Sequence, residues 1–595
     1  MAIGLSGWQR THMCGLIGED MVGQEVCLMG WVQRERNLGS LIFVDLRDRE
    51  GIVQVVFNQQ ENDAAVFAVG EGLSREYVLA VKGRVAARAG AVNDRMATGR
   101  VEVNVTQARL LNRAEVPPIY IEDNVDESEA VRLKYRYLDL RRPALQSTLR
   151  LRAQVLSAIR RYMDGQGFVD VETPILTKST PEGARDFLVP SRIHPGEFYA
   201  LPQSPQIYKQ LLMLAGFDRY YQVARCFRDE DNRADRQPEF TQLDMEMSFV
   251  EPENIQKVVE GAYAQVFREV MGLELTLPLP RMTWRDAMEQ YGSDKPDTRF
   301  EMRIACLDEA VRGCGFKVFE DTLANGGTVR GLCARGAAAQ LSRKEVDALG
   351  EFVKTYRAKG LAWALLEEGG ARSSFGKFVT PEAFAALCDA LDAKPGDAIF
   401  LVADKPTVAL TALGQLRLRL GKQLGLIDPQ VYNLFWVTEF PLLEWDEDQR
   451  RFLAMHHPFT SPMDEDAAKM ETDPGDVRAK AYDLVLNGVE MGSGSIRIYA
   501  SDLQERMFAL LGFTHEQAWN RFGFLLEAFR YGTPPHGGFA FGIDRLIMML
   551  TGSESLRDVI AFPKVQNASC LMMATPSTVA EEQLEMLKIK LDTQA

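Results

Sequence analysis

The sequence lacks the features of secreted, membrane-spanning and zinc-binding proteins. No uninterrupted apolar stretch approaches the ~18 residues that a membrane span requires. Residues 1–10 lack the basic start and apolar block of a signal peptide. Eight cysteines are scattered without a CxxC pair, which argues against a zinc site of the usual spacing and is typical of reduced thiols. We therefore expect a cytoplasmic protein that does not contact a membrane.

Positive charge is also scarce in this chain. The 68 Lys and Arg residues face 83 Asp and Glu residues, which gives a net charge of −15. Any contact with RNA must come from local basic patches, because the acidic remainder suppresses non-specific binding. With 46% apolar residues, the 595-residue chain can build sizeable cores, and its length suggests about four domains of roughly 150 residues each.

The most informative stretch is FRDEDNRADRQPEFTQLDME at residues 227–246, which places charges of both signs beside an apolar strand pattern. Arg228 can direct two donors at a phosphate or carboxylate. Glu230 and Asp231 can take an amino group or a metal-bound nucleotide, and Phe240 offers a stacking face for a base. The stretch predicts a site for a polyanion. The alternative is a solvated hairpin with surface ion pairs, which describes most charge runs.

Two further stretches carry related signals. In GGFAFGIDRL at residues 537–546, the glycines allow close approach of the backbone to a ligand. Phe539 and Phe541 alternate as in a buried strand. Arg545 follows where a helix should begin, and can lie flat on a purine while reaching a phosphate. In GFVDVETPIL at residues 167–176, Pro174 ends a strand.

Together these stretches resemble motifs 2, 3 and 1 of class II aminoacyl-tRNA synthetases, in the form carried by bacterial-type aspartyl-tRNA synthetases of the aspartate, asparagine and lysine subgroup. Each stretch alone could be an ordinary strand or helix start, but three in the right order make coincidence improbable. The resemblance covers nearly the entire chain. It implies an α+β multidomain protein with an N-terminal OB-fold β-barrel, a class II antiparallel-sheet catalytic domain and an inserted α+β domain. Motif 1 normally builds a dimer interface, so a homodimer is expected.

The domain limits follow from these patterns and from the resemblance. Short alternating strands between residues 24 and 110 predict a small barrel. Helical spacing from Leu145 to Met163 and from Ile255 to Val266 predicts two packed helices. The predicted division is an anticodon-binding OB-fold at 1–113, a hinge at 114–143, the first catalytic part with motifs 1 and 2 at 144–304, the inserted domain at 305–412, the second catalytic part with motif 3 at 413–563, and a polar, helix-like C-terminal extension at 564–595.

A candidate RNA-binding face lies on the predicted barrel. In SLIFVDLR, Ile42, Val44 and Leu46 share one face, so Phe43 stands on the polar face, where it can stack on an unpaired base. A plain surface aromatic is the alternative. The resemblance implies tRNA anticodon contacts at Arg36, Leu38, Phe43, Gln54 and Glu102. On tRNA range the signals conflict, because Leu38 resembles the strict type whereas Gly90 replaces a lysine that strict enzymes often carry.

The resemblance also implies an amino-acid pocket. It surrounds the substrate's α-amino group with Glu182, Ser204, Gln206 and Asp244, and it directs Lys209 and Arg497 at the side chain, with Arg228 and His456 contacting the substrate's carboxylates. Two cations aimed at one cavity make sense only if the ligand brings an anion, because a buried unpaired charge costs several kcal/mol. The predicted amino acid is therefore L-aspartate.

A hairpin signal suggests a magnesium site. Asn487-Gly488 between apolar strands is typical of a type I′ turn, which pairs Val485 with Glu490 and puts Asp483 on the same face. Two converging carboxylates are plausible Mg²⁺ ligands, although solvent-facing acids on an edge hairpin are the alternative. By resemblance, ATP contacts Arg228, Asp229, Glu230, Gln237, Phe240, Glu490, Gly542, Ile543, Asp544 and Arg545, of which Arg228, Glu490 and Arg545 are catalytic.

The predicted function is that of an aspartate–tRNA ligase. Such an enzyme activates L-aspartate with ATP to aspartyl-adenylate, releases pyrophosphate, and transfers aspartate to the 3′ end of tRNA(Asp), with tRNA(Asn) left open. The expected ligands are ATP and Mg²⁺, and DNA is not expected as a partner. A lysyl- or asparaginyl-specific relative has no reason to aim both Lys209 and Arg497 at a side chain. A regulatory or RNA-binding paralogue without catalysis has no need of Arg228, Glu490 and Arg545.

Overall fold

The computed structural model describes residues 4–124, 126–180, 184–231 and 233–592. The chain forms two compact units. The first consists of Met1–Val155, Glu230–Pro238 and Ile547–Ala595, and the second consists of Leu156–Asp229 and Glu239–Leu546. Within the described ranges, every helix is too short or too polar to span a bilayer.

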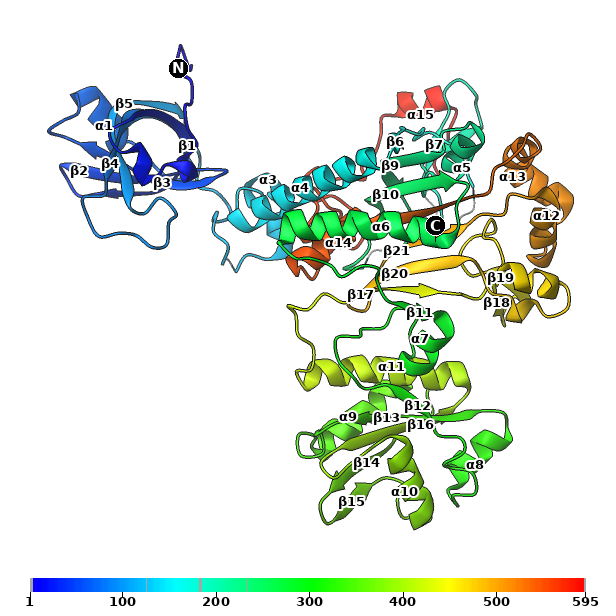
Figure 1. Ribbon diagram of the computed structural model, residues 1–595. Helices are drawn as coiled ribbons and strands as arrows, with labels where there is room; N and C mark the ends of the chain where they lie inside the picture. Colours follow the sequence, from blue (N-terminus) through cyan, green and yellow to red (C-terminus); the bar gives the residue numbers. More distant parts are fainter. Residues whose placement is uncertain (1–3, 125, 181–183, 232, 593–595) are drawn as a thin grey trace. The chain divides into compact units, whose positions relative to one another are not determined.

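A closed barrel forms the N-terminal part of the first unit (Figure 1). Ile42, Val44 and Leu46 are fully buried inside it, while Phe43 is half-buried, as the alternating pattern predicts. The predicted OB-fold barrel is confirmed. Its strands, in the order β1-β2-β3-β5-β4, are β1 (Glu25–Asn37), β2 (Leu41–Asp48), β3 (Gly51–Asn58), β5 (Val101–Asn112) and β4 (Val78–Ala87), and the barrel segment also includes helix α1 (Ala64–Glu71).

Three helices follow the barrel, and the short helix α3 (Arg136–Asp139) is tied to the C-terminal part of the same unit. The buried guanidinium of Arg136 donates hydrogen bonds to the carbonyl oxygens of Arg557, Ile560 and Ala561 at 2.8–2.9 Å. Its ion pair with Asp139 measures 2.7 Å. The helices are α2 (Glu129–Lys134), α3 (Arg136–Asp139) and α4 (Pro143–Gly165), and one short helix, α15 (Glu581–Leu587), lies in the described part of the C-terminal extension.

An eight-stranded sheet forms the core of the second unit, and all its pairs are antiparallel except β11–β17 and β6–β9. The 227–246 stretch contributes the end of β9 and most of β10, and the 537–546 stretch forms β22 and the start of α14, as predicted. The strand order is β11 (Arg281–Thr283), β17 (Leu434–Thr438), β20 (Ala481–Leu486), β21 (Val489–Ile496), β22 (His536–Gly542), β10 (Glu239–Ser248), β9 (Arg219–Phe227) and β6 (Val169–Asp170).

The predicted helix over Ile255–Val266 is α6, and the predicted helix over Leu145–Met163 is α4, so both predictions are confirmed. The remaining elements around the sheet are α5 (Gln206–Leu214), α6 (Pro252–Val266), α7 (Trp284–Tyr291), α12 (Ser501–Leu510), α13 (His515–Phe529) and α14 (Ile543–Thr551), with the short strand pairs β7 (Leu188–Pro190) and β8 (Phe198–Ala200), and β18 (Leu443–Asp446) and β19 (Arg451–Ala454).

The inserted segment of the second unit is a sheet with an apolar core on each face (Figure 1). The predicted limit at residue 412 falls inside α11, whose apolar residues up to Leu420 belong to the insert core, so the segment extends to Gln423. The elements are β12 (Ile304–Cys306), β13 (Thr328–Ala334), β16 (Ala398–Asp404), β14 (Ala362–Glu367) and β15 (Gly370–Ser373) in sheet order, with α8 (Lys317–Ala324), α9 (Arg343–Lys354), α10 (Pro381–Ala390) and α11 (Pro406–Gln423).

Arg417 of α11 fixes the start of the insert. Its buried guanidinium donates to the carbonyl oxygens of Phe300 at 2.7 Å and Met302 at 2.9 Å. It also lies 3.9 Å from the centroid of the Phe300 ring. Burial lowers the pKa of Arg417 to about 10.

We predict that Arg417→Leu destabilises the insert, because two buried carbonyl groups lose their donor and each such loss costs about 1–3 kcal/mol. Urea unfolding followed by circular dichroism measures the change. Arg372→Leu is the control, because Arg372 forms only an exposed ion pair with Glu367 in the same segment. Equal shifts of the unfolding midpoint in the two variants would contradict the structural role given to Arg417.

Candidate active site

Four buried charged residues form the centre of the site, and we call them the ionic cluster: Lys209, Asp244, Glu246 and Arg497. Asp244 and Glu246 alternate on β10 and so face the same side of the sheet. Lys209 on α5 places Nζ 3.4 Å from Asp244 Oδ1 and 3.5 Å from Glu246 Oε2. Arg497, directly after β21, donates from Nε to Glu246 Oε1 at 3.0 Å and from Nη1 to Ser495 Oγ at 2.7 Å. Two cations and two carboxylates therefore balance each other.

This balance corrects one step of the sequence argument. The cations are not unpaired, because Glu246 contacts both Lys209 and Arg497. The premise of an unpaired positive pocket is therefore wrong. Burial opposes ionisation of Glu246, but Arg497 and Lys209 hold the pKa of this carboxyl below its ordinary value. The signal for Glu246 was present in the sequence, since it lies two residues after Asp244 in a strand pattern.

Several buried polar atoms beside the ionic cluster lack a hydrogen-bond partner among the described residues: Asp244 Oδ2, Gln206 Nε2 and Gln210 Nε2. Burial raises the pKa of Asp244. Unsatisfied buried polar atoms are rare in folded proteins and require an explanation such as a ligand. A ligand amino group can donate to Asp244. Ser204 lies just before α5, and its Oγ accepts a hydrogen bond from the Gln206 amide at 3.3 Å. Glu182 lies outside the described residues.

Two adjacent histidines lie in different surroundings. His456 Nε2 lies 3.4 Å from Asp483 Oδ1, and its ring packs edge-on against Phe440. His457 is half-buried, and desolvation together with Arg497 and Lys209 lowers its pKa to about 3. Its Nδ1 accepts the Phe459 amide at 3.3 Å, so the neutral ring carries its proton on Nε2. The sequence reasoning selected His456, whereas the ionic cluster influences His457; contact of His456 with a substrate stays a prediction.

The predicted nucleotide residues of the second unit lie on β10, on α14 and at their flanks. The Arg228 guanidinium lies 5.2 Å from the centroid of the Phe240 ring, and no carboxylate in the described ranges forms an ion pair with it. Arg545 donates from Nη1 to the backbone oxygen of Glu490 at 2.8 Å. Asp544 accepts the Thr241 amide at 2.8 Å. Ile543 is fully buried, so this residue can offer a ligand only its backbone. Gly542 ends β22 directly before these residues.

The other residues of the 227–246 stretch have protein partners. Asp229, in the second unit, accepts with its backbone oxygen from Arg185 Nε at 3.3 Å and donates its amide to the Arg185 oxygen at 3.0 Å. Glu230, in the first unit, forms an ion pair with Arg236. Gln237, also in the first unit, donates to the Lys564 oxygen at 3.0 Å and accepts the Lys564 amide at 2.8 Å. The roles predicted for these residues toward ATP stay predictions.

The hairpin predicted around Asn487-Gly488 has the expected register. Val485 pairs with Glu490 and Leu486 with Val489, and both turn residues have positive φ. A bulge follows Glu490, after which Asp483 pairs with Ser493. Burial and the nearby Asp483 raise the pKa of Glu490. The role of the two acids as magnesium ligands stays a prediction.

These acids fit a divalent cation by their chemistry. Asp483 Oδ1 is buried and lacks a hydrogen-bond partner in the described part of the chain, and carboxylate oxygens are the preferred ligands of Mg²⁺. The side chain of Lys295 lies beside these acids. Lys295 Nζ lies 3.7 Å from Glu490 Oε2 and 3.2 Å from Asp294 Oδ1. Within the described ranges, no three metal-ligating side chains are already gathered as a complete site.

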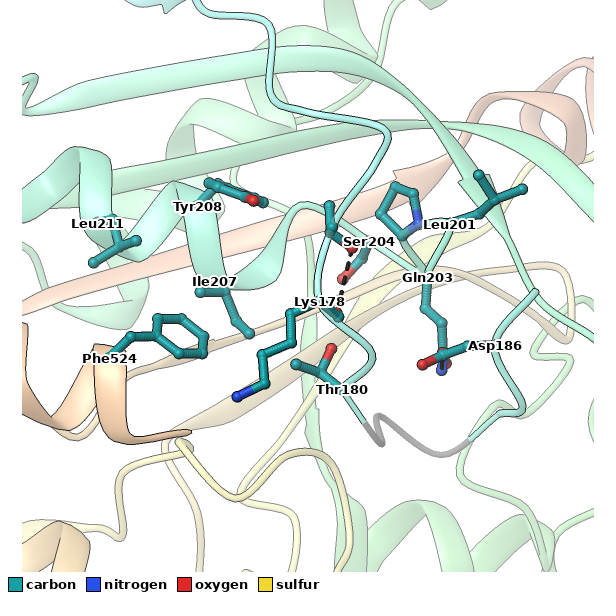
Figure 2. A pocket seen from close by; sticks show the side chains of 12 residues that line it. Lys178, Thr180, Asp186, Leu201, Gln203, Ser204, Ile207, Tyr208, Leu211 and Phe524 are labelled. Atoms are coloured by element: carbon teal, nitrogen blue, oxygen red, sulfur yellow. Dashed lines mark hydrogen bonds between the residues drawn. The ribbon is translucent and has the colours of Figure 1, made fainter. Parts of the chain in front are cut away.

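A separate cavity of about 230 Å³ lies on the other face of α5 (Figure 2). Ile207, Tyr208 and Leu211 line it, whereas Gln206, Lys209 and Gln210 point to the buried side of the helix. Lys178 and Phe524 line another part of the wall, where Lys178 Nζ donates to the Asn520 oxygen at 3.1 Å. Ser204 also lines this cavity. It lies just before α5, the helix that carries Lys209.

The barrel brings four of the predicted RNA-contacting residues together. Arg36 Nη2 donates to Gln54 Oε1 at 3.2 Å, and Gln54 Nε2 donates to Glu102 Oε2 at 2.8 Å. The Arg36 guanidinium lies 5.8 Å from the centroid of the Phe43 ring. The sequence reasoning missed Arg88, which donates to the same Gln54 oxygen at 2.6 Å. Leu38 is exposed just beyond β1.

A closed OB barrel, and an antiparallel sheet that carries buried charges beside a strand–helix motif, define the architecture of class II tRNA synthetases. The family model "tRNA synthetases class II (D, K and N)" matches residues 128–566, and the model "OB-fold nucleic acid binding domain" matches residues 26–111. The fold is similar to asparaginyl-tRNA synthetase from Pyrococcus horikoshii (TM-score 0.58, 19% identity, 93% of this chain and 98% of that chain). It is also similar to aspartyl tRNA synthetase from Entamoeba histolytica (0.54, 19%, 92% and 89%).

Curated relatives narrow the family. The aspartate–tRNA ligase of Clostridium perfringens is 56% identical over 99% of this chain and 98% of its own length. The aspartate–tRNA(Asp/Asn) ligase of Bacillus cereus is 58% identical over 98% of this chain and 99% of its own length. The chain therefore belongs to the bacterial aspartyl-tRNA synthetase family within the D, K and N group of class II synthetases.

We predict that Glu246→Gln destabilises the fold at neutral pH by about 3–5 kcal/mol, because two buried cations lose a shared charged partner. The folded state holds the pKa of Glu246 below its ordinary 4.5, so its contribution is complete above that pH and is lost as pH falls through the lowered pKa. The deficit should therefore shrink in acid.

Unfolding curves of the parent and variant from pH 7 to pH 3 measure this change. Glu274→Gln, which removes an exposed carboxylate paired with Arg268, is the control and should change stability little. A deficit for Glu246→Gln that is the same at every pH would rule out the charge as its cause.

Proposed function

We propose that this chain activates L-aspartate with ATP and transfers it to the 3′ end of tRNA(Asp). The ionic cluster carries this proposal, because it offers an acceptor for an amino group and cationic donors for a carboxylate in one buried place. The aspartate–tRNA ligases that match nearly the full length of the chain agree with it.

The substrate binds by joining the existing charge balance. Its α-amino group donates to Asp244 Oδ2, which has no partner in the described ranges, with Ser204, Gln206 and Glu182 around it. Its β-carboxylate shares Lys209 and Arg497 with Glu246. A lysine side chain would bring a third cation to this place, and asparagine would bring no charge for the two cations. Since the anion makes these contacts, aspartate is preferred over both.

His457 adds a neutral donor to the same pocket. Its Nδ1 is occupied by the Phe459 amide, so Nε2–H is the free donor of the ring. His456 is the second histidine that we assign to the substrate, through a contact that forms as the site closes. A neutral ring beside two cations avoids the cost of a third buried positive charge.

The first step is attack of the substrate α-carboxylate on the α-phosphate of ATP. Arg228 has its guanidinium free of carboxylate partners in the described ranges, so it can direct two donors at the phosphoryl oxygens where negative charge grows. Magnesium held by Asp483 and Glu490 would supply further positive charge at the phosphates. Catalysis needs no covalent enzyme intermediate, since positioning and electrostatics lower the barrier.

The nucleotide and the departing pyrophosphate are held by residues around β10 and α14. Phe240 offers a stacking face to adenine, and Arg545 binds the purine and the phosphates. The backbone of Gly542, Ile543 and Asp544 lines the approach, and Asp229 is also assigned to ATP. The contacts of Glu230 and Gln237 with the nucleotide and the acceptor end stay predictions. The terminal ribose hydroxyl of tRNA then attacks the mixed anhydride, which releases AMP.

The barrel reads the anticodon in this proposal. Phe43 stacks on an unpaired base, while Arg36, Gln54 and Glu102 offer donors and acceptors to base edges. Leu38 follows Arg36 by two residues in the sequence. Arg88 also donates to the Gln54 side-chain oxygen and so helps to hold Gln54 in place. Relatives named aspartate–tRNA ligase and aspartate–tRNA(Asp/Asn) ligase are similarly close to this chain, so tRNA(Asn) is the second candidate acceptor.

A homodimer accounts for exposed apolar residues around motif 1. Exposed large apolar side chains occur at subunit interfaces, and cyclic dimers are the commonest soluble oligomers. A ligase that charges tRNA acts where translation occurs, which favours the cytoplasm. The exposed residues are Val169, Ile175, Leu176, Leu188, Ile193, Phe198, Tyr199 and Phe217.

Amino-acid-dependent exchange of pyrophosphate into ATP tests the substrate. Aspartate should support exchange, and asparagine and lysine should not. Charging of purified tRNA(Asp) and tRNA(Asn) side by side then decides the tRNA range. Exchange with asparagine or lysine in place of aspartate, or no exchange with any of them, would overturn the proposed function.

We predict that Arg228→Lys slows aspartate activation by about a hundredfold or more while binding of aspartate and ATP weakens less. The variant keeps the charge but loses the two-donor fork that stabilises the growing charge. Single-turnover rates and substrate titrations separate the two effects. Arg225→Lys, three residues away with an ion pair to Glu239, is the control; a parental rate in Arg228→Lys would remove Arg228 from catalysis.

We also predict that Phe43→Ala weakens tRNA charging by about 1–3 kcal/mol, the value of one stacked base. Aspartate-dependent pyrophosphate exchange without tRNA should stay at the parental rate, because Phe43 belongs to the barrel and not to the ionic cluster. Phe378→Ala, which removes an exposed aromatic ring of the insert, is the matched control. A parallel loss of exchange and charging would show that Phe43 supports folding instead.

A further inference from the structure

Lys295 is held in place by the loop that precedes the insert. Asn433 links this loop to the hairpin that carries Glu490. Its Nδ2 donates to the backbone oxygen of Thr298 in the loop at 3.2 Å, and its backbone amide donates to Asn487 Oδ1 in the hairpin at 2.9 Å. Buried Asp297 packs beside Gly488 of the same hairpin. Lys295 therefore reaches Glu490 from a fixed backbone, not from a mobile one.

The charges around Lys295 do not balance. Its ammonium faces Asp294 at 3.2 Å and Glu490 at 3.7 Å, and Asp483 completes a group of three carboxylates on one ammonium. Arg545 also acts on Glu490, so the three carboxylates exceed the two permanent cations, Lys295 and Arg545, by one negative charge. Asp483 Oδ1, buried and without a hydrogen-bond partner in the described part of the chain, is a second sign that a cation belongs here. His456 Nε2 at 3.4 Å is the nearest donor to it.

We propose that Lys295 is a resident counter-cation of Glu490 that leaves this carboxylate when the metal–nucleotide complex binds and then contacts the phosphates. This inference rests on the proposed function, because it takes Asp483 and Glu490 as the magnesium ligands. An ammonium and a divalent cation repel each other at contact distance, so the two do not share the Glu490 carboxylate. The triphosphate offers the displaced ammonium a new anionic partner.

The position of Lys295 favours the phosphate end of the nucleotide. Arg545, assigned to the phosphates, donates to the backbone oxygen of the same residue, Glu490. A lysine suits an exchange of partners, since it is a compact charge on a flexible four-carbon stem. The side chain is 43% exposed, which leaves it room to move. Lys295 is thus a positioning residue for ATP, and in the free enzyme it offsets part of the negative charge of the acids.

Binding of Mn²⁺ to the full-length enzyme without nucleotide tests this proposal, with electron paramagnetic resonance reporting free Mn²⁺. Lys295→Met removes the charge and keeps the stem, so Mn²⁺ should bind about tenfold more tightly or better, as loss of a unit charge at about 4 Å predicts. In aspartate-dependent exchange, the same variant should show a KM for ATP raised about tenfold with the KM for aspartate unchanged.

Three variants complete the test. Lys469→Met is the matched control, with 47% exposure and an aspartate partner at 2.7 Å, and should keep parental values. Lys295→Arg keeps the charge and should keep parental Mn²⁺ affinity. Adding Glu490→Gln to Lys295→Met should abolish the gain in affinity. Circular dichroism melting confirms that each variant is folded.

The results separate this inference from the function on which it rests. Unchanged Mn²⁺ affinity in Lys295→Met, or a gain that persists after Glu490→Gln, would overturn the role of Lys295. A parent enzyme without aspartate-dependent exchange would overturn the proposed function, and the Mn²⁺ measurement would still report on Lys295 by itself. An unchanged KM for ATP in a variant that gains Mn²⁺ affinity would refute the contact with the phosphates.

Discussion

The ion pair between Glu246 and Arg497 is the interaction on which the rest of the site depends. It is fully buried and joins β10 to the end of β21, two strands separated in the sheet by β22. Buried pairs of this kind are retained only where both partners are also hydrogen-bonded, and here Ser495 and Lys209 complete the set. The strand between them carries Gly538, where any side chain would collide with Glu246. The missing side chain at Gly538 thus leaves the space that the Glu246 carboxylate occupies.

A balanced cluster gives the site its selectivity. Because Lys209 and Arg497 already have carboxylate partners, the free protein does not bear the cost of unpaired buried cations. An entering anion must share these donors with Glu246, whereas an entering amino group finds Asp244 Oδ2 without a partner. In the proposed function, the amino acid therefore binds as a zwitterion with a second anion. The surroundings of Lys295 differ, because there one ammonium contacts two carboxylates and the missing charge is positive.

Much of the fold follows from local patterns. The barrel strands, both packed helices, the β22–α14 junction and the register of the Asn487-Gly488 hairpin agree with the sequence, because alternation, helical spacing and turn chemistry act over a few residues. The limit at 412 failed because α11 is apolar on both sides of that residue, and only its packing in the insert core shows where the segment ends. The candidate site was predictable as a set of residues through the resemblance, not as a set of contacts.

The sequence by itself determined the family and the order of the two matched domains, and it predicted a set of charged residues for the site. Only the tertiary structure decided how those charges pair. Glu246, His457, Arg88 and Lys295 meet their partners across strands and loops far apart in the chain, so local patterns do not show these pairings. The physical reason is that electrostatic balance is a property of three-dimensional distance and burial. A carboxylate two residues along a strand or two hundred and fifty residues away neutralises a cation equally well once both are buried at about 3 Å.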